Sequence, residues 1–254
     1  MDTFLPAIAV PLILALLKWS MPHRERVDID ELKLAQNAKK YNRYELLSLI
    51  PLFIYIPLVA YLFYLLGTTF FSTTNKEEGV VLFYAADAMI WPVVGLCFAF
   101  GTIMLPMNKL YEFLLKEEFD LYIEYTNRKH GFDGFKVWRP FSYLMIILGG
   151  VTMCLAKNAY FKVTENKVVV NHFFSMQPVE THFYEIGRIV LYQKAKAPNG
   201  NVFNNEHYVI YGKNDKIVLD ESFKFFELKE STIHHLLEKC KLTLEKQDLR
   251  MDKT

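Results

Sequence analysis

The sequence lacks any concentration of positive charge. Its 29 Lys and Arg are balanced by 28 Asp and Glu, and no run of Lys and Arg is longer than two residues. Proteins that bind nucleic acid through its phosphates carry a basic patch or stripe. We therefore predict that nucleic acid is not a partner.

Cysteine is scarce as well. Cys97 and Cys154 lie in apolar stretches, and Cys240 alone lies in a polar part of the 254-residue chain. A disulfide framework needs several cysteines in the same soluble domain. Each part of the chain is therefore expected to fold without a disulfide.

Sequence motifs that carry common chemistry are missing. The chain has no GxxxxGK[ST], GxGxxG, HExxH, GxSxG or CxxC pattern. His172, His182 and His207 fall on predicted strands, but their spacing matches no zinc site, and we interpret them as exposed or hydrogen-bonded histidines. We predict that the protein is not an enzyme and that it holds no cofactor and no metal.

Long apolar stretches, in contrast, are prominent before residue 157. A helix rises about 1.5 Å per residue and the hydrocarbon core is about 30 Å thick, so a span needs roughly 20 apolar residues. Residues 46–71 carry no charge, and residues 80–107 carry only Asp87. Both stretches are hydrophobic on all sides, which is typical of membrane helices, and we predict that both cross the bilayer.

Two shorter stretches, residues 4–19 and 140–156, are also predicted to span. Lys18 with Trp19 and Trp138 with Arg139 supply the aromatic and basic anchors of a membrane surface. A segment that only dips into the bilayer stays possible for each. No cleavage site follows the first stretch, so we expect it to remain in the mature protein. Residues 1–156 are thus predicted to form a membrane α-helical bundle of four transmembrane helices.

The distribution of Lys and Arg predicts the orientation. Residues 18–44 contain seven of them and residues 108–139 contain six, whereas the connection 72–79 contains only Lys76. The positive-inside rule places both basic loops, 18–44 and 108–139, in the cytoplasm of a bacterial inner membrane. With four spans the C-terminal domain is extracytoplasmic; if residues 140–156 do not cross, it is cytoplasmic.

Helices are predicted in both basic connections. Apolar residues recur every three or four positions in residues 108–131, where His130-Gly131 could end the helix. A second helix in residues 28–44 would begin at Asp28 or Asp30.

Residues 157–254 are predicted to form a soluble α+β domain. Alternating apolar residues indicate strands at 160–164, 167–173, 179–184, 188–194, 207–211 and 216–219. The longest loop is predicted at 197–205, and a helix at 225–244 closes an antiparallel β meander.

The segments YFKVTENKVVVNHF, FYEIGRIVLY and IYGKNDKIVL carry a resemblance to a known family. In strand order, and in the helix that follows, the region 160–244 resembles the bacterial pleckstrin-homology-like (PH-like) domains that are attached to membrane spans. The resemblance implies a binding or assembly module without catalytic residues. An outward-facing copy would depart from the family.

Asp87 is the one carboxylate within a predicted span. Such residues usually face a bundle interior or a water-filled cavity and mark a functional pathway. The hydroxyl groups of Tyr84 and Tyr55 could form hydrogen bonds with the Asp87 carboxylate. The three residues therefore make up a candidate intramembrane polar site. The alternative is a hydrated Asp at the membrane surface, since only about two turns separate Asp87 from Gly79.

Two functions follow from these predictions. The first is a non-enzymatic multi-pass membrane protein, in contact with the lipid bilayer, whose β domain binds a protein partner; an immunity protein against a membrane-targeting or secreted toxin is one concrete form. The alternative is a small transporter or channel that uses Asp87 in a membrane cavity.

Overall fold

The computed structural model describes residues 11, 15, 31–71, 79–175, 177–197, 199–221 and 228–249. The chain divides into two compact units. The helical unit consists of Met1–Leu66 and Trp91–Cys154, and the β unit consists of Gly67–Ile90 and Leu155–Thr254. The chain therefore passes three times from one unit to the other.

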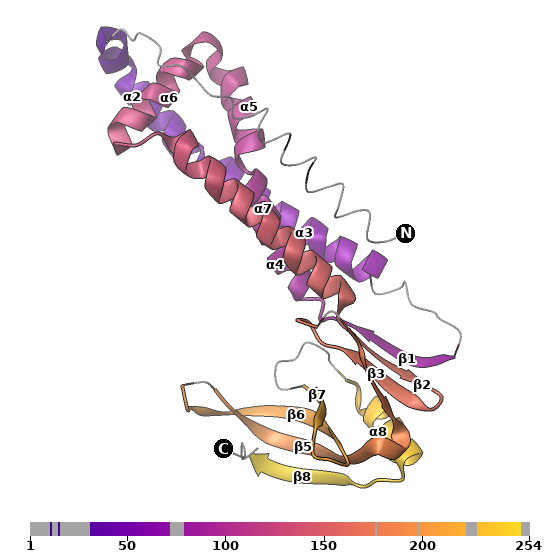
Figure 1. The fold of residues 1–254 in the computed structure, drawn as a ribbon. Coiled ribbons are helices and arrows are strands. Elements are labelled where there is room, and N and C mark those ends of the chain that lie inside the picture. The colour runs from indigo at the N-terminus through magenta and orange to yellow at the C-terminus, as the bar shows by residue number, and fades with distance from the viewer. Residues whose placement is uncertain are drawn as a thin grey trace. The chain divides into compact units, whose positions relative to one another are not determined.

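The helical unit is built from six described α-helices (Figure 1). In chain order they are α2 (Glu31–Leu47), α3 (Leu49–Leu66), α4 (Ile90–Thr102), α5 (Met104–Leu115), α6 (Phe119–His130) and α7 (Gly134–Asn158). A π-helical turn, η1 (Gly67–Phe71), follows α3, and a 3-10 turn, η2 (Lys116–Glu118), joins α5 to α6.

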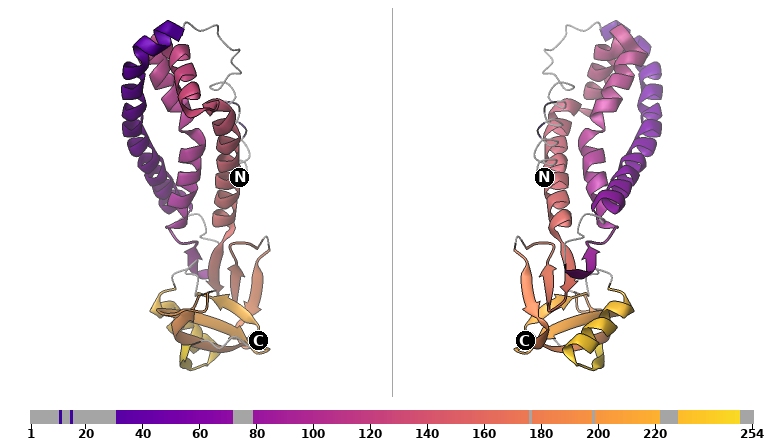
Figure 2. Two further views of the ribbon diagram at one scale, coloured as in Figure 1. Left: turned by 90° about the vertical axis from the view of Figure 1, so that its left-hand side faces the viewer. Right: turned by 90° about the vertical axis from the view of Figure 1, so that its right-hand side faces the viewer.

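Three helical runs among the described residues are long and apolar enough to cross a membrane. They are Glu31–Thr69, Ile90–His130 and Gly134–Asn158. The predicted span 4–19 lies outside the described residues except for positions 11 and 15, and so do Asp28 and Asp30, the predicted start of the helix in residues 28–44. Figure 2 shows α2 and α3, in indigo and purple, as one continuous bowed run.

Helix α7 is longer than the predicted span 140–156. It has 25 residues and begins at Gly134, which gives a length of about 37 Å, more than the roughly 30 Å of a hydrocarbon core. The Asp133 carboxylate starts the helix by accepting a hydrogen bond from the Phe135 backbone N–H at 3.0 Å. Charged residues at both ends belong to the helix, and a search for uncharged runs misses them.

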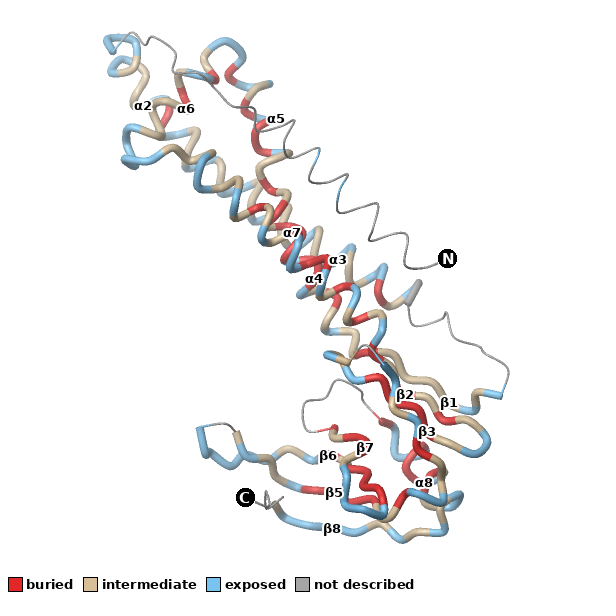
Figure 3. Tube along the Cα trace, in the orientation of Figure 1, coloured by how far each residue is buried: buried red, intermediate tan, exposed pale blue. Residues whose placement is uncertain are grey.

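Glycines bring the apolar helices close together. A Cβ on Gly95 would lie 2.7 Å from Ala60 Cα, so the backbones of α4 and α3 almost touch. A Cβ on Gly101 would lie 2.6 Å from the Ile146 side chain of α7. Small residues at helix contacts are the usual packing mode of membrane helices. The outer surface remains apolar, since α3 has no buried residue and much of it is exposed (Figure 3).

The β unit begins with a strand where a membrane span was predicted. β1 (Val80–Ala85) pairs antiparallel with β2 (Tyr160–Thr164), and the helix α4 starts only at Ile90. The prediction of one span over residues 80–107 is therefore wrong in its first ten residues. A short apolar run rich in β-branched and aromatic residues suits a strand as well as a helix, and periodicity cannot separate the two.

Two four-stranded sheets make up the β unit. The first has the order β1-β2-β3-β4, with β3 (Lys167–Asn171) and β4 (Val179–His182), and all its pairs are antiparallel. The second has the order β7-β6-β5-β8, with β5 (Ile186–Lys196), β6 (Val202–Gly212), β7 (Ile217–Asp220) and β8 (Leu244–Leu249). β8 runs parallel to β5. A short 3-10 turn, η3 (Phe183–Glu185), connects β4 to β5.

The C-terminal helix is shorter than predicted. α8 spans Glu230–Cys240, and the residue that follows it, Lys241, adopts a left-handed conformation with φ of 55°. The chain then forms β8, a strand that the sequence analysis had not predicted. Residues 225–227 lie outside the described residues.

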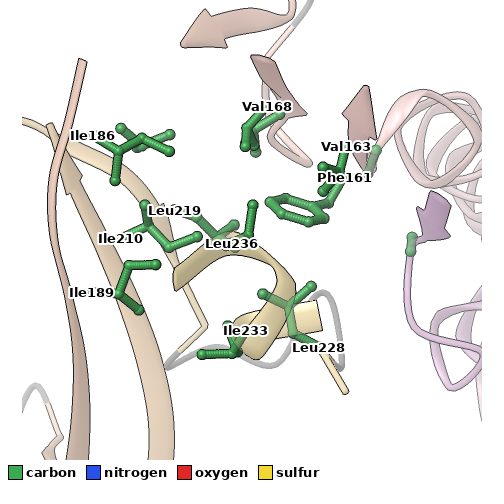
Figure 4. Packing of buried hydrophobic residues seen from close by; sticks show 14 residues of the cluster. Phe161, Val163, Val168, Ile186, Ile189, Ile210, Leu219, Leu228, Ile233 and Leu236 are labelled. Carbon is green, nitrogen blue, oxygen red and sulfur yellow. The ribbon is translucent and has the colours of Figure 1, made fainter. Parts of the chain in front are cut away.

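One apolar core joins both sheets and α8. Figure 4 shows the buried side chains of this core pointing toward one another. Phe161 and Val163 come from the first sheet, Ile189 and Ile210 from the second, and Leu236 from α8, and all five are fully buried. The predicted soluble α+β domain is thus present, with β1 as an addition from the segment between α3 and α4.

Candidate functional site

Asp87 lies between β1 and α4, outside any helix. Its Oδ1 accepts a hydrogen bond from the Met89 backbone N–H at 2.8 Å, and its backbone carbonyl accepts one from Ile90 N–H at 3.1 Å. These contacts form a tight turn over residues 87–90 that leads into α4, which begins at Ile90. The placement of this carboxylate within a span was therefore wrong, because the residues before it form a strand.

The other two residues of the predicted polar site also have local partners. The Tyr84 hydroxyl, on β1, shares a short hydrogen bond with the buried Thr232 Oγ1 of α8. The Tyr55 hydroxyl, on α3, lies 2.8 Å from Thr102 Oγ1 of α4. Tyr84 and Asp87 belong to the β unit and Tyr55 to the helical unit. The structure therefore gives these three residues separate structural roles.

The three histidines that were predicted to lie on strands do not come together in one site. His172 is exposed, and the His182 ring stacks on Tyr184 with ring centroids 5.3 Å apart. His207 is buried, and its Nδ1 lies 2.8 Å from the Asn205 carbonyl oxygen. Within the described ranges, no three His, Cys, Asp or Glu side chains gather as a metal site would require.

The helical unit contains a cavity of about 240 Å³ where α3, α5, α6 and α7 meet. Its described lining is apolar and aromatic, including Met107, Tyr111, Tyr122 and Trp138, with neutral polar groups such as Asn127. No Asp, Glu, Lys, Arg, His or Cys is among these lining residues. The hydroxyl groups in these walls, such as those of Tyr111 and Tyr122, have no charged side chain beside them among the described lining residues.

Ion pairs and contacts between tyrosine rings beside this cavity join α2 to α6. The Glu45 carboxylate accepts hydrogen bonds from Lys129 Nζ at 2.6 Å and lies 2.7 Å from His130 Nε2. The Tyr41 ring, which is fully buried, meets the Tyr122 ring edge to face at 5.7 Å. Because these contacts join two helices of the same unit, we interpret them as structural.

The most exposed apolar feature of the second sheet is the far part of the β5–β6 hairpin. β8 pairs with β5 only as far as Lys194, and β7 pairs with β6 only from Val209 to Tyr211. Beyond Lys194, the strand pairs found among the described residues are those within the hairpin, Ala195 with Phe203 and Lys196 with Val202. We call residues 195–196 and 202–203 the hairpin arm.

The hairpin arm presents apolar and basic side chains to solvent. Val202 and Phe203 are each 49% exposed, and Lys196 is exposed as well. No Asp or Glu occurs between Lys194 and Asn205. A two-stranded ribbon is marginally stable in water by itself, and its open edges and apolar side chains favour pairing with another chain.

A defined turn closes the arm. The Ala197 N–H donates to the Asn201 carbonyl at 2.8 Å, and the Gly200 N–H donates to the Ala197 carbonyl at the same distance. Gly200 has a φ of +88°, which glycine adopts without strain. The prediction of a loop over residues 197–205 is wrong from Val202 onward, where β6 begins. Val202 and Phe203, a β-branched and an aromatic residue, were the signal in the sequence that indicated a strand here.

Comparison with known proteins gives no relative: no family model, no curated protein and no solved structure matches this chain.

Proposed function

We propose that this chain is a non-enzymatic, multi-pass membrane protein whose β unit binds a protein partner. The observation that carries the proposal is the hairpin arm, where Val202 and Phe203 are half exposed on strands that, among the described residues, pair there only with each other. Exposed apolar groups beside lysines suit a partner with an apolar contact surface rimmed by acidic side chains.

The order of elements in the β unit supports a PH-like module. Six strands, β2 to β7, follow one another in antiparallel order within each of the two sheets, and α8 comes after them. Such an order is the one that the resemblance implies. Two features are additional to it, since β1 comes from the segment between α3 and α4, and β8 follows the helix.

The side of the membrane follows from the basic loops. All three passages between the units lead to the same β unit, so the adjoining ends of the three candidate spans must open on one side. The basic residues lie toward the opposite ends, because residues 18–44 precede and begin the first candidate span and residues 108–139 connect the second to the third. The positive-inside rule then favours a cytoplasmic location for these loops and an extracytoplasmic one for the β unit.

An extracytoplasmic binding module on a bacterial inner membrane suits an immunity protein that intercepts a membrane-targeting or secreted toxin. The alternative of a transporter or channel was motivated by a carboxylate within a span. Asp87 lies in the turn before α4, outside the candidate span Ile90–His130, which weakens that motivation.

The proposal is tested by a photo-crosslinking amino acid placed at Phe203 in the full-length protein in cells. We expect a discrete protein adduct at this position and none at Tyr184, an equally aromatic and 69% exposed residue of the same unit. Lys196→Glu should weaken the adduct at position 203, because it reverses the charge beside the apolar contact.

The same cells are then exposed to culture supernatants of competing strains. Survival that depends on the protein, and is lost in Phe203→Asp but kept in Tyr184→Asp, would support the immunity function. Equal adducts at both positions, or no adduct at Phe203, would contradict partner binding through the arm.

A further inference from the structure

One end of the first sheet is defined by the helices that enter it. Helix α7 ends at Asn158 and leads directly into β2 at Tyr160. Ala85, the last residue of β1, pairs with Tyr160 at this same end, and α4 begins five residues later at Ile90. The end of the sheet formed by Ala85 and Tyr160 is therefore the end attached to two candidate membrane spans; we call it the helix end.

The connection between β3 and β4 also lies at the helix end. Asn171, the last residue of β3, pairs with Tyr160, and its Nδ2 donates a hydrogen bond to the Asn158 carbonyl at 2.7 Å. The connection that follows Asn171 leads to β4, whereas the other two connections described at this end join the sheet to α4 and α7. It begins with a tight turn, in which the Ser175 N–H donates to the His172 carbonyl at 2.8 Å.

This turn presents a phenylalanine to its surroundings. Phe173 packs against the core of the β unit, and the Phe174 ring stands nearly perpendicular to it with centroids 5.0 Å apart. Phe174 is 80% exposed, the highest value for a large apolar side chain in the described parts of the chain. Met89, in the short connection from β1 to α4 at the helix end, is 67% exposed.

The connection after β3 differs in charge from the opposite end of the sheet. Residues 171–178 contain no Asp or Glu, and Lys157 lies in the last turn of α7. Asp87, in the connection from β1 to α4, is a carboxylate at the helix end, and Lys167 is a basic residue at the opposite end. The opposite end carries Glu165, in the turn from β2 to β3, and Glu185, in η3 after β4. Aromatic and basic residues are enriched where a protein meets the lipid headgroups, whereas carboxylates are repelled by anionic lipids.

We propose that residues 172–175 form a membrane-contacting turn, with Phe174 inserted among the headgroups of the bilayer that α4 and α7 cross. The turn, Met89 and Lys157 then form a lipid-facing rim around the helix end of the sheet. The partner of this surface is the lipid bilayer, and the inference is independent of the side on which the β unit lies and of any protein that it binds.

Membrane contact at this rim would hold the β unit at a fixed height and tilt. Two covalent connections, through α4 and α7, fix two points of the sheet end, and Phe174 supplies a third in the turn after β3. A third point restricts rotation of the β unit about the line through the first two. The opposite end of the first sheet, with Glu165 and Glu185, is then kept in water.

The test uses full-length protein in vesicles of phosphatidylethanolamine and phosphatidylglycerol. A benzophenone amino acid replaces Phe174 in one sample and Tyr184 in another. Tyr184 is the matched control because it is exposed and aromatic but lies in η3, after the strand end where His182 pairs with Lys167. After illumination, mass spectrometry should find lipid adducts several-fold more often at position 174 than at position 184.

A second readout separates a membrane contact from a contact with protein. A nitroxide on Phe174→Cys, in a chain with the three native cysteines replaced, should be more accessible to dissolved oxygen than to a water-soluble nickel chelate. The order should be reversed for Tyr184→Cys. Equal lipid adducts at both positions, or a nitroxide at position 174 that is fully accessible to the chelate, would overturn the proposal.

Discussion

Individual polar residues of the β unit are satisfied by specific partners in its core. Glu221, which is buried, accepts hydrogen bonds from the backbone N–H groups of Tyr208 at 3.1 Å and Leu228 at 2.6 Å. The Tyr84 hydroxyl joins Thr232 in the same way. A buried polar group that loses its partner costs about 1–3 kcal/mol, so these contacts specify where β1 and α8 must lie.

Replacing Tyr84 with Phe should destabilise the β unit. Because Thr232 Oγ1 would lose this partner inside the core, we expect the free energy of unfolding to fall by about 1 kcal/mol. Denaturant unfolding followed by near-ultraviolet circular dichroism measures the change. Tyr184→Phe, at an exposed position of η3, is the control and should leave the midpoint unchanged; an equal loss in both variants would contradict a role for the Tyr84 hydroxyl.

Cys240 should react slowly with alkylating reagents. Burial in α8 raises the pKa of its thiol from an ordinary value near 9.0 to about 11, so the thiol stays protonated at neutral pH. A rise of two units leaves about a hundredfold less thiolate, which is the reactive form. Mass spectrometry after iodoacetamide treatment at pH 8 should show little modification of Cys240 until the β unit is unfolded by denaturant, and rapid modification of the native protein would contradict this burial.

At the scale of elements, helix contacts in the helical unit depend on small residues. The positions of Gly95 and Gly101 on α4 allow α3 and α7 to approach it closely. Sequence reasoning found the apolar stretches of these helices but gave no reason to expect which faces meet. Helix pairing depends on side-chain shape along two surfaces, and neither surface is marked by polarity in an all-apolar stretch.

Gly95→Leu should separate α3 from α4. The new side chain would meet Ala60 Cα and the Phe63 Cβ within 3 Å, which are positions that cannot move without shifting α3. We expect a loss of about 1–3 kcal/mol, measured as a lower temperature at which the detergent-solubilised protein loses its monodisperse gel-filtration peak. Gly134→Ala is the control, since its Cβ would make only an ordinary contact with Asn127. The two variants should differ clearly, and equal behaviour would argue against close α3–α4 packing.

The amphipathic connection 108–131 illustrates a prediction that was right in type and partly wrong in extent. Helix α6 ends at His130, and Gly131 adopts a left-handed conformation with φ of 75°, as His130-Gly131 had indicated. The helix is interrupted, however, at Lys116, which has a φ of 49°. No glycine or proline marks this interruption in the sequence. Leu115 and Phe119, on either side of the turn, are buried in the core of the helical unit, so the interruption depends on tertiary packing.

At the scale of the whole molecule, the β unit draws its strands from both sides of the helical segments α4 to α7. β1 precedes these helices and β2 follows them, and the two strands pair along their length. The connection after α3 and the C-terminal region must therefore occupy the same compartment. Which compartment this is stays the proposal drawn from the basic loops 18–44 and 108–139.

Single cysteines should report this arrangement in intact cells. Val81→Cys in β1 and Lys213→Cys after β6 are exposed positions of the β unit, and Glu117→Cys lies in η2 of the helical unit. With the native cysteines replaced, a membrane-impermeant maleimide should label positions 81 and 213 from outside and position 117 only after the membrane is opened. Opposite labelling of positions 81 and 213 would contradict the shared sheet.

The sequence by itself determined that the chain contains apolar stretches long enough for membrane-spanning helices, followed by a region of strands and a helix. Both follow from local patterns, since uncharged stretches and alternation along a strand are properties of neighbouring residues. Only the tertiary structure decided that residues 80–85 form a strand, that another strand, residues 244–249, follows the last helix, and that Asp87 lies in the turn before α4. Helix hydrogen bonds join residues four apart, whereas the partners of β1 and β8 lie far away in the chain, so their conformation depends on a fold that no local window contains.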